Sequence, residues 1–116
     1  MKTRNKQESE RNVMKFFSSL ADETRLHILM SMAESPKTVN DIYTSVGRSK
    51  LTLSAISHQL RQMSDLGIVE YEKKGREKFY KLSGKFCWCI LRDALGQFGN
   101  NINIKCEKCK KERRHK

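Results

Sequence analysis

The alternation of apolar and polar positions predicts a chain built mainly from helices. Apolar residues recur at the spacing of one helix face, first in a helix from about Glu10 to Leu20. Three more such patterns follow, at about residues 23–34, 38–46 and 52–66. A fifth helix is expected after the break at Ser83–Gly84 and runs through Phe98, with Trp88 on its apolar side.

Capping residues indicate where these helices begin and end. Asp22 and Thr38 are good N-caps, and Asp41 stands three residues after Thr38, as in a capping box. Pro36 ends the second helix because the residue before a proline is pushed out of the helical region. Gly47 is expected to be the C-cap of the third helix.

A two-residue periodicity follows the fourth helix. Residues 68–71 and 78–82 alternate in polarity and are joined by the basic turn 73–76, which predicts a β-hairpin. A short helix, a turn, a second helix and a hairpin form a winged helix. We therefore expect a mainly α fold with a small β-hairpin, a winged helix-turn-helix with about five helices and a two-stranded wing.

The fourth helix also carries a polar face. Ser54, Ser57, His58 and Arg61 lie on one stripe, without an acidic residue between Ser54 and Met63. Such a face suits the major groove of DNA, although it is equally typical of an ordinary surface helix. The formal charge of +11 and the pI near 9.8 favour an acidic partner, most simply nucleic acid.

Length and composition limit the class of protein. With 116 residues and 37% hydrophobic residues, the chain has room for one domain with a thin core. No stretch is apolar for long enough to cross a membrane, and the polar N-terminus does not resemble a secretory signal. We expect a cytoplasmic protein with no membrane partner. It has no sequence pattern of an enzyme, because paired carboxylates, a phosphate-binding glycine loop and triad spacing are missing.

The patterns divide the chain into three expected parts. Residues 1–10 form a flexible tail, residues 11–98 the winged-helix domain, and residues 99–116 a basic tail that contains cysteines. The first and last helices carry more apolar surface than a small monomer needs. We expect them to pair in a homodimer, with packing of the first helix against the second as the alternative.

Several segments resemble the ArsR/SmtB family of winged-helix repressors. The segment Leu20–Leu29 is similar to the family's helix-2 signature, Ser54–Arg61 to the core of its recognition helix, and Leu66–Val69 with residues 74–82 to its wing. The resemblance covers about residues 13–98. It implies a homodimeric repressor that binds a roughly palindromic double-stranded DNA operator and releases it when an effector binds.

The resemblance also implies which residues contact DNA: Ser54, Ser57, His58, Gln59 and Arg61 in the major groove, with Lys74 and Arg76 from the wing. For His58, a capping or packing role is the alternative. The chain departs from the family in the longer stretch from Gly47 to Ser54, which affects the docking angle. It also lacks the family's cysteine pair in the third helix and its histidine in the fifth.

The cysteines suggest a sensor site of a different kind. Cys106 and Cys109 form a Cys-x-x-Cys pair, which is half of a tetrahedral thiolate site. Cys87 and Cys89 would point about 200° apart in a regular helix, so both reach one ion only if the first helical turn is irregular. Residues 99–106 are long enough to return to their own helix or to cross to a partner subunit.

We hypothesise that these four thiols bind a metal or metalloid ion, such as zinc or arsenite. The alternatives are an oxidant-driven switch that joins the thiols, or structural cysteines without an effector. In the last case the chain would be a plain winged-helix repressor or an architectural DNA-binding protein. A thiol enzyme is disfavoured because the strand and helix setting of a thioredoxin-like site is missing.

Overall fold

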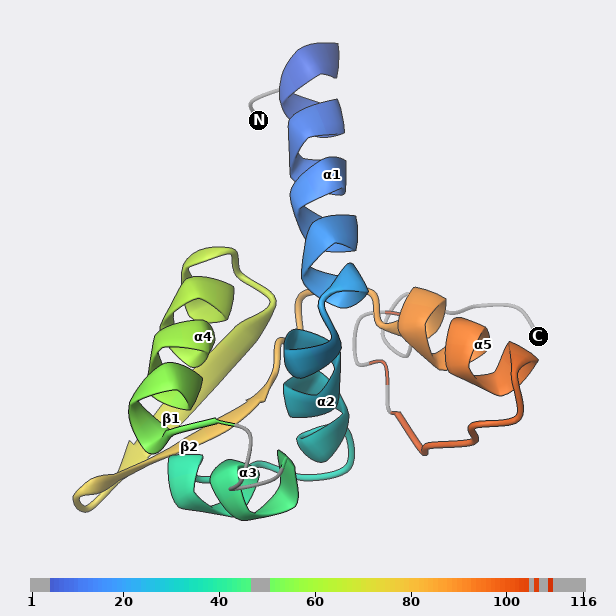
Figure 1. Cartoon of the computed structure of the whole chain (residues 1–116). Coiled ribbons are helices and arrows are strands. Elements are labelled where there is room, and N and C mark those ends of the chain that lie inside the picture. The colour runs from blue at the N-terminus through green and yellow to red at the C-terminus, as the bar shows by residue number, and fades with distance from the viewer. Residues whose placement is uncertain (1–4, 47–50, 105, 107–108, 110–116) are drawn as a thin grey trace.

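The computed structural model describes residues 5–46, 51–104, 106 and 109. Within these residues the chain forms five helices and two strands (Figure 1). The order of elements confirms the predicted winged helix-turn-helix. The elements are α1 (Lys6–Ala21), α2 (Glu23–Ser31), α3 (Val39–Val46), α4 (Leu53–Asp65), β1 (Val69–Lys74), β2 (Glu77–Leu82) and α5 (Cys89–Gln97).

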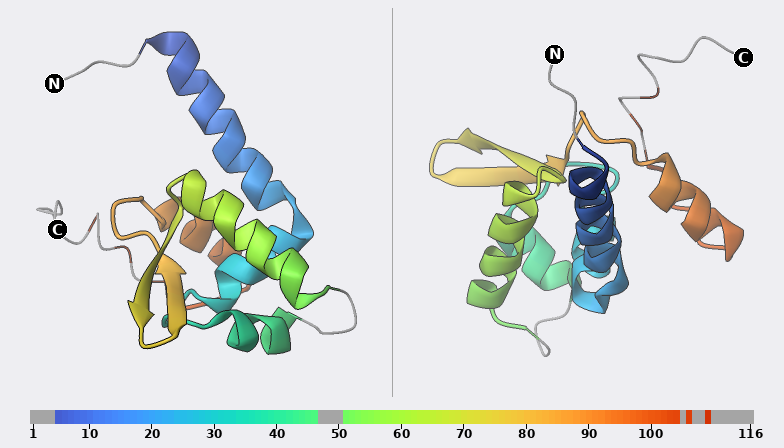
Figure 2. Two further views of the ribbon diagram at one scale, coloured as in Figure 1. Left: turned by 90° about the vertical axis from the view of Figure 1, so that its left-hand side faces the viewer. Right: turned by 90° about the horizontal axis from the view of Figure 1, so that it is seen from above.

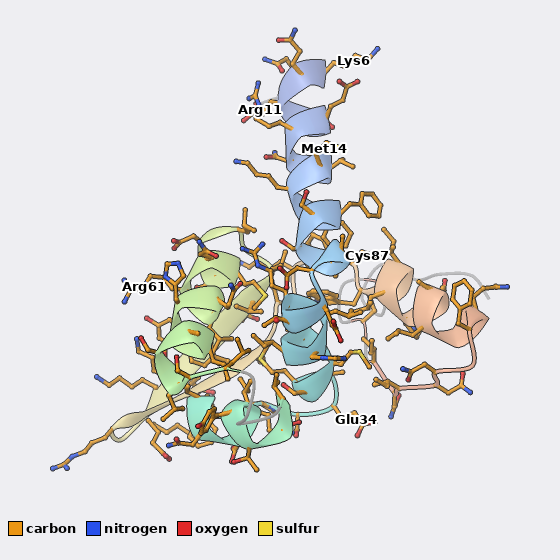
Figure 3. All side chains as sticks on the ribbon, viewed as in Figure 1. Lys6, Arg11, Met14, Glu34, Arg61 and Cys87 are labelled. Atoms are coloured by element: carbon orange, nitrogen blue, oxygen red, sulfur yellow. The ribbon has the colours of Figure 1, made fainter. Side chains whose placement is uncertain are left out.

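Helix α1 begins about four residues earlier than the apolar pattern indicates. The Asn5 side chain accepts the backbone N–H of Glu8 at 2.7 Å and so caps the helix. Residues 6–12 are polar on every face, and apolar periodicity therefore carries no signal there. Figures 1 and 3 show this half of α1, with Lys6 and Arg11, extending away from the other elements.

The capping residues of the next two helices are confirmed. The Asp22 carboxylate accepts the N–H of Arg25 at 3.0 Å. Thr38 and Asp41 bond reciprocally, as a capping box does: the Thr38 hydroxyl accepts the Asp41 N–H at 3.1 Å, and the Asp41 carboxylate accepts the Thr38 N–H at 3.2 Å. In α4 the corresponding residue is Thr52. The predicted C-cap Gly47 lies outside the described residues.

The wing is a tight antiparallel hairpin. Its register runs from Val69 opposite Leu82 to Lys74 opposite Glu77, which leaves Gly75 and Arg76 as the turn. Gly75 has a φ of 65°, a conformation that glycine adopts without strain. The strands are therefore longer than the sequence pattern indicated. A backbone bridge between Lys37 and Tyr80 attaches the segment before α3 to the second strand.

One hydrophobic core joins the helices, the wing base and the C-terminal segment. The inner face of α4 is fully buried, and it packs with residues from α2, α3 and the start of α5. The chain reverses after α5, and Ile104 and Cys106 return to this core with 2% and 7% of their surface exposed. The core includes Ile28, Leu29, Ile42, Ile56, Leu60, Met63, Trp88 and Leu91.

We expect Leu60→Ala to lower the free energy of unfolding by about 2–5 kcal/mol, because the deleted carbons leave a cavity in this core. Leu53→Ala is the matched control on the same helix, since Leu53 is 39% exposed. Urea unfolding of both variants measures the difference. Equal losses in the two variants would contradict the core assignment.

Candidate metal centre and nucleic-acid interface

The sulfurs of the four cysteines lie together where α5 begins. All four are free thiols, and their Sγ atoms lie within 4.8 Å of one another. The sulfur of Cys109 lies 3.4 Å from that of Cys87 and 3.3 Å from that of Cys89, and Cys106 lies 4.0 Å from Cys87. Zinc–sulfur bonds of about 2.3 Å imply tetrahedral sulfur–sulfur edges of roughly 3.8 Å. The observed spacing therefore fits a four-thiolate ion site.

The irregular turn required by the sequence analysis is present. Helix α5 starts only at Cys89, with Trp88 as its N-cap residue. Cys87 therefore precedes the helix, and the direction of its side chain relative to Cys89 is not set by the helical rotation of 100° per residue. Trp88 was expected within the helix, and it is instead the residue that lets both cysteines face one point. Figure 3 shows Cys87 at this junction, between α2 and α5.

The C-terminal segment takes the route back to its own helix. The N–H of Asn100 donates to the carbonyl of Leu95 at 2.8 Å, and Gly99 has a φ of 84°, which together turn the chain round. Ile104 then fills a buried position two residues before Cys106. A single chain therefore supplies all four sulfurs.

Backbone N–H groups favour a thiolate at Cys106. Burial opposes its ionisation, but hydrogen bonds from the N–H groups of Cys109 and Trp88 lower the pKa of Cys106 to about 6. The Trp88 N–H lies 3.3 Å from this sulfur. The pKa of Cys109 is raised to about 12 because Cys89, Cys87 and Cys106 surround its thiol with hydrogen bonds. Since the pKa of Cys106 is lowered and the pKa values of Cys89 and Cys109 are raised, Cys106 ionises more readily than these two thiols.

The polar stripe of α4 is exposed on the side away from α5. Ser54, Ser57, His58 and Arg61 are all exposed, and Figure 3 shows Arg61 extending outward from this helix. Lys74 and Arg76 are exposed at the tip of the wing. The structure therefore brings six of the seven residues predicted to contact DNA to accessible positions on α4 and the wing.

Gln59 is placed differently from the other predicted contacts. Its side-chain oxygen accepts a hydrogen bond from Nε of Arg25 at 2.6 Å, and the oxygen of Gln62 accepts one from the same guanidinium at 2.8 Å. Gln59 therefore faces α2 rather than the exposed stripe. Periodicity alone does not show which flank of a helix meets its neighbour. The contact of Arg25 with Gln59 and Gln62 was therefore not predictable from the sequence.

A hollow of about 640 Å³ lies between α4, the start of α3 and the wing. Arg61 and Arg76 both line it, together with Ser57 and Asn40. Lys78 also lines it, and the sequence analysis did not single out this residue. Its place on β2, two residues after Arg76, was the available signal. The hollow is thus lined by three cationic side chains, from α4 and the wing, and also by the carboxylates of Asp65 and Glu77.

An apolar surface on α1 and α5 lies on the other side of the molecule. Its large residues remain exposed: Val13, Met14, Phe17, Ile90 and Phe98, the last to 88%. A further hollow of about 500 Å³ runs between Phe17, Leu26 and Leu95. Figure 2 shows the wing and α5 on opposite sides of the fold, so this surface is separate from the α4 face. None of the described helices is long and apolar enough to cross a membrane.

Comparison with known proteins agrees with the resemblance seen in the sequence. The model of the family described as "Bacterial regulatory protein, arsR family" matches residues 22–71. A transcriptional repressor SmtB homolog of Synechocystis is 33% identical over 78 residues, which cover 67% of this chain and 57% of the relative. A cadmium resistance regulatory protein, the CadC homolog of Staphylococcus aureus, is 32% identical over 85 residues, covering 72% and 68%.

Solved structures show the same fold. The AntR antimony-specific transcriptional repressor is 28% identical with a TM-score of 0.63, covering 84% of each chain. A homodimeric winged helix-turn-helix domain from Mycobacterium bovis is 23% identical with a TM-score of 0.63, covering 100% of this chain and 99% of its own. The chain spans less than two thirds of the SmtB homolog. The matched family is one of regulators, in agreement with the prediction of a non-enzyme, and the chain belongs to the ArsR family of bacterial regulatory proteins.

Proposed function

We propose that this chain is a homodimeric transcriptional repressor that leaves its DNA operator when a thiophilic ion binds Cys87, Cys89, Cys106 and Cys109. The observation that carries the proposal is the gathering of four sulfurs within 4.8 Å on the fold of a regulatory family. Free thiols are typical of the cytoplasm, where we expect the protein to act.

The exposed face of α4 and the wing supports DNA binding. Ser54, Ser57, His58 and Arg61 would enter the major groove, while Lys74 and Arg76 would contact the backbone on either side. Gln59 would act indirectly, because its contact with Arg25 holds α4 against α2. The overall charge of +11 adds attraction that does not depend on DNA sequence.

The apolar surface on α1 and α5 supports a homodimer. Exposed Met14, Phe17 and Phe98 would be buried by a second copy, which offers the same surface through a two-fold axis. The similar domain from Mycobacterium bovis is described as homodimeric. A two-fold dimer would set its α4 helices in successive major grooves and would match a palindromic operator.

The donor set favours a tetrahedral ion of the zinc type, including cadmium. Four thiolates satisfy such an ion completely, whereas arsenite would leave one cysteine unused. The relative from Staphylococcus aureus is named for cadmium resistance and AntR for antimony. Cadmium is therefore the first ion to test, with arsenite as the comparison.

A second candidate function is favoured by the burial of Cys106 and Ile104 in the core. A closed four-thiolate site in such a position also serves as a structural staple, as in small zinc domains. In that case the protein would be a repressor without an ion effector, and metal removal would unfold the C-terminal segment instead of changing DNA affinity.

We expect the DNA affinity to fall by about 10³–10⁵ between 50 and 200 mM salt, as for a dimer with several phosphate contacts. Arg61→Ala should cost about 1–3 kcal/mol for the selected operator and relax its specificity, whereas Lys74→Ala should weaken all sequences alike. Fluorescence anisotropy with operator and random DNA measures both effects. A flat salt response would contradict DNA binding through these faces.

We expect the double variant Cys89→Ser/Cys109→Ser, which leaves the buried Cys106 and its contact with Trp88 in place, to bind operator as the wild type does but to lose release by cadmium. Two serines remove half of the thiolate set while leaving the α4 face untouched. Titration of the protein–DNA complex with cadmium, arsenite and a mild oxidant measures release. Ion release that survives in this variant would contradict the site, and release by the oxidant alone would identify a redox switch.

We expect cadmium affinity to rise with pH between 6 and 8. Cys109 has a pKa raised to about 12 and the pKa of Cys89 is also raised, so ion binding must displace their protons, while Cys106 with a pKa of about 6 is already a thiolate. Each proton that the ion displaces makes the cadmium affinity rise by about a further tenfold per pH unit. Chelator competition at three pH values measures the slope, and a pH-independent affinity would contradict four-thiolate binding.

A further inference from the structure

We propose that Trp88 transmits the state of the cysteine centre to the base of the wing and so controls how the wing is held against α4. The inference rests on the proposed ion site and deepens the proposed function by naming the residue through which the ion acts. It follows from a continuous set of hydrogen bonds that begins at Cys106 and ends at β1.

The first link joins the centre to the backbone of Trp88. The Trp88 N–H donates to the sulfur of Cys106 at 3.3 Å, and both residues are buried, with 1% and 7% exposed. Water cannot replace this bond at such burial, so a change in the position of the sulfur acts directly on the Trp88 peptide. Trp88 is also the N-cap residue of α5: its carbonyl accepts the N–H of Arg92 at 3.0 Å, whereas its own N–H has no acceptor within the helix.

The second link joins the same residue to the end of the wing. The indole N–H of Trp88 donates to the backbone carbonyl of Ser83 at 2.9 Å. Ser83 directly follows the last residue of β2 and is itself buried. A tryptophan has one side-chain donor, and a buried indole N–H left without an acceptor is destabilising. The indole and Ser83 are therefore expected to move together.

The third link reaches both α4 and the first strand. The Ser83 N–H donates to the carbonyl of Ile68 at 3.1 Å, and Ile68 connects the end of α4 to β1. The next N–H, that of Gly84, donates to the carboxylate of Glu70 on β1 at 3.0 Å. Ser83 and Gly84 therefore bind both the end of α4 and the first strand. The indole of Trp88 connects Ser83 in turn to the cysteine centre.

Ion binding would change the start of this path. In the structure, three sulfur–sulfur contacts of 3.3–4.0 Å join the cysteines through weak thiol hydrogen bonds. A tetrahedral ion would bring all sulfur–sulfur distances to roughly 3.8 Å and would fix the position of the Cys106 sulfur. The Trp88 peptide, and with it the carbonyl partner of its indole, would then be held in one position. The wing would present its basic tip in a different average orientation.

A second, packing-based path gives a matched control. The Phe86 ring lies 5.0 Å from the ring of Trp88 and 4.7 Å from that of Phe16 on α1, centroid to centroid. This path leads to α1 instead of the wing. Phe86→Leu trims the packing beside Trp88 but leaves its indole hydrogen bond in place, whereas Trp88→Phe keeps an aromatic ring and removes the N–H.

The test is amide hydrogen exchange of the full chain, with and without cadmium and without DNA, on the wild type, Trp88→Phe and Phe86→Leu. In the wild type and in Phe86→Leu, cadmium should slow exchange at Ser83 and Gly84 about tenfold, the scale of one secured local hydrogen bond. In Trp88→Phe the slowing should persist at Ile104 and vanish at Ser83. Full slowing at Ser83 in Trp88→Phe, or none in the wild type, would overturn the inference.

The indole NMR signal and the release of operator DNA test the same inference in two further ways. The chain has one tryptophan, so its indole N–H gives a single NMR signal, and cadmium should shift that signal in the wild type without any substitution. An unmoved indole signal in the cadmium-loaded protein would overturn the inference even if Trp88→Phe fails to fold. Cadmium that releases operator equally from the wild type and Trp88→Phe would overturn it while leaving the proposed function in place. Cadmium that alters exchange at Ser83 but leaves DNA affinity unchanged would contradict the proposed function alone.

Discussion

The burial of Cys106 against the backbone of Trp88 is the constraint on which the C-terminal half of the molecule depends. It places the N-cap of α5 at Trp88, is accompanied by the return of Ile104 to the core, and sets Cys87 outside the helix. A thiolate in this place receives two backbone N–H groups, which explains the low pKa of Cys106. The other three thiols then gather around a sulfur whose position is already fixed.

This arrangement puts the cysteine centre between the two exposed surfaces for which we propose different roles. The face of α4 and the wing lies on one side, and the apolar surface of α1 and α5 on the other (Figure 2). Trp88 contacts the wing base through Ser83, and α5 begins directly after it. A change at the cysteines therefore has a short physical route to the wing and to the surface that we propose binds DNA. An ion changes the DNA affinity only as far as the affinity of the protein for the ion differs between one orientation of the wing and another.

Local rules predicted much of the fold, and tertiary contacts determined the rest. Asp22 and the Thr38–Asp41 pair were predictable because a cap depends only on residues three positions apart. The four candidate ligands were predictable from residue type, but the start of α5 at Cys89, which leaves Cys87 before the helix, involves the contact of Trp88 with Cys106, which follows much later in the chain. The orientation of Gln59 was missed because it depends on Arg25 of another helix.

The most direct test of the central claim is X-ray absorption spectroscopy of the zinc-loaded protein, combined with a count of ions per chain. One chain supplies all four sulfurs in this structure, so we expect one ion per chain with four sulfur ligands at about 2.3 Å. Nitrogen or oxygen ligands in the first shell, or one ion for every two chains, would contradict a centre closed within a single subunit.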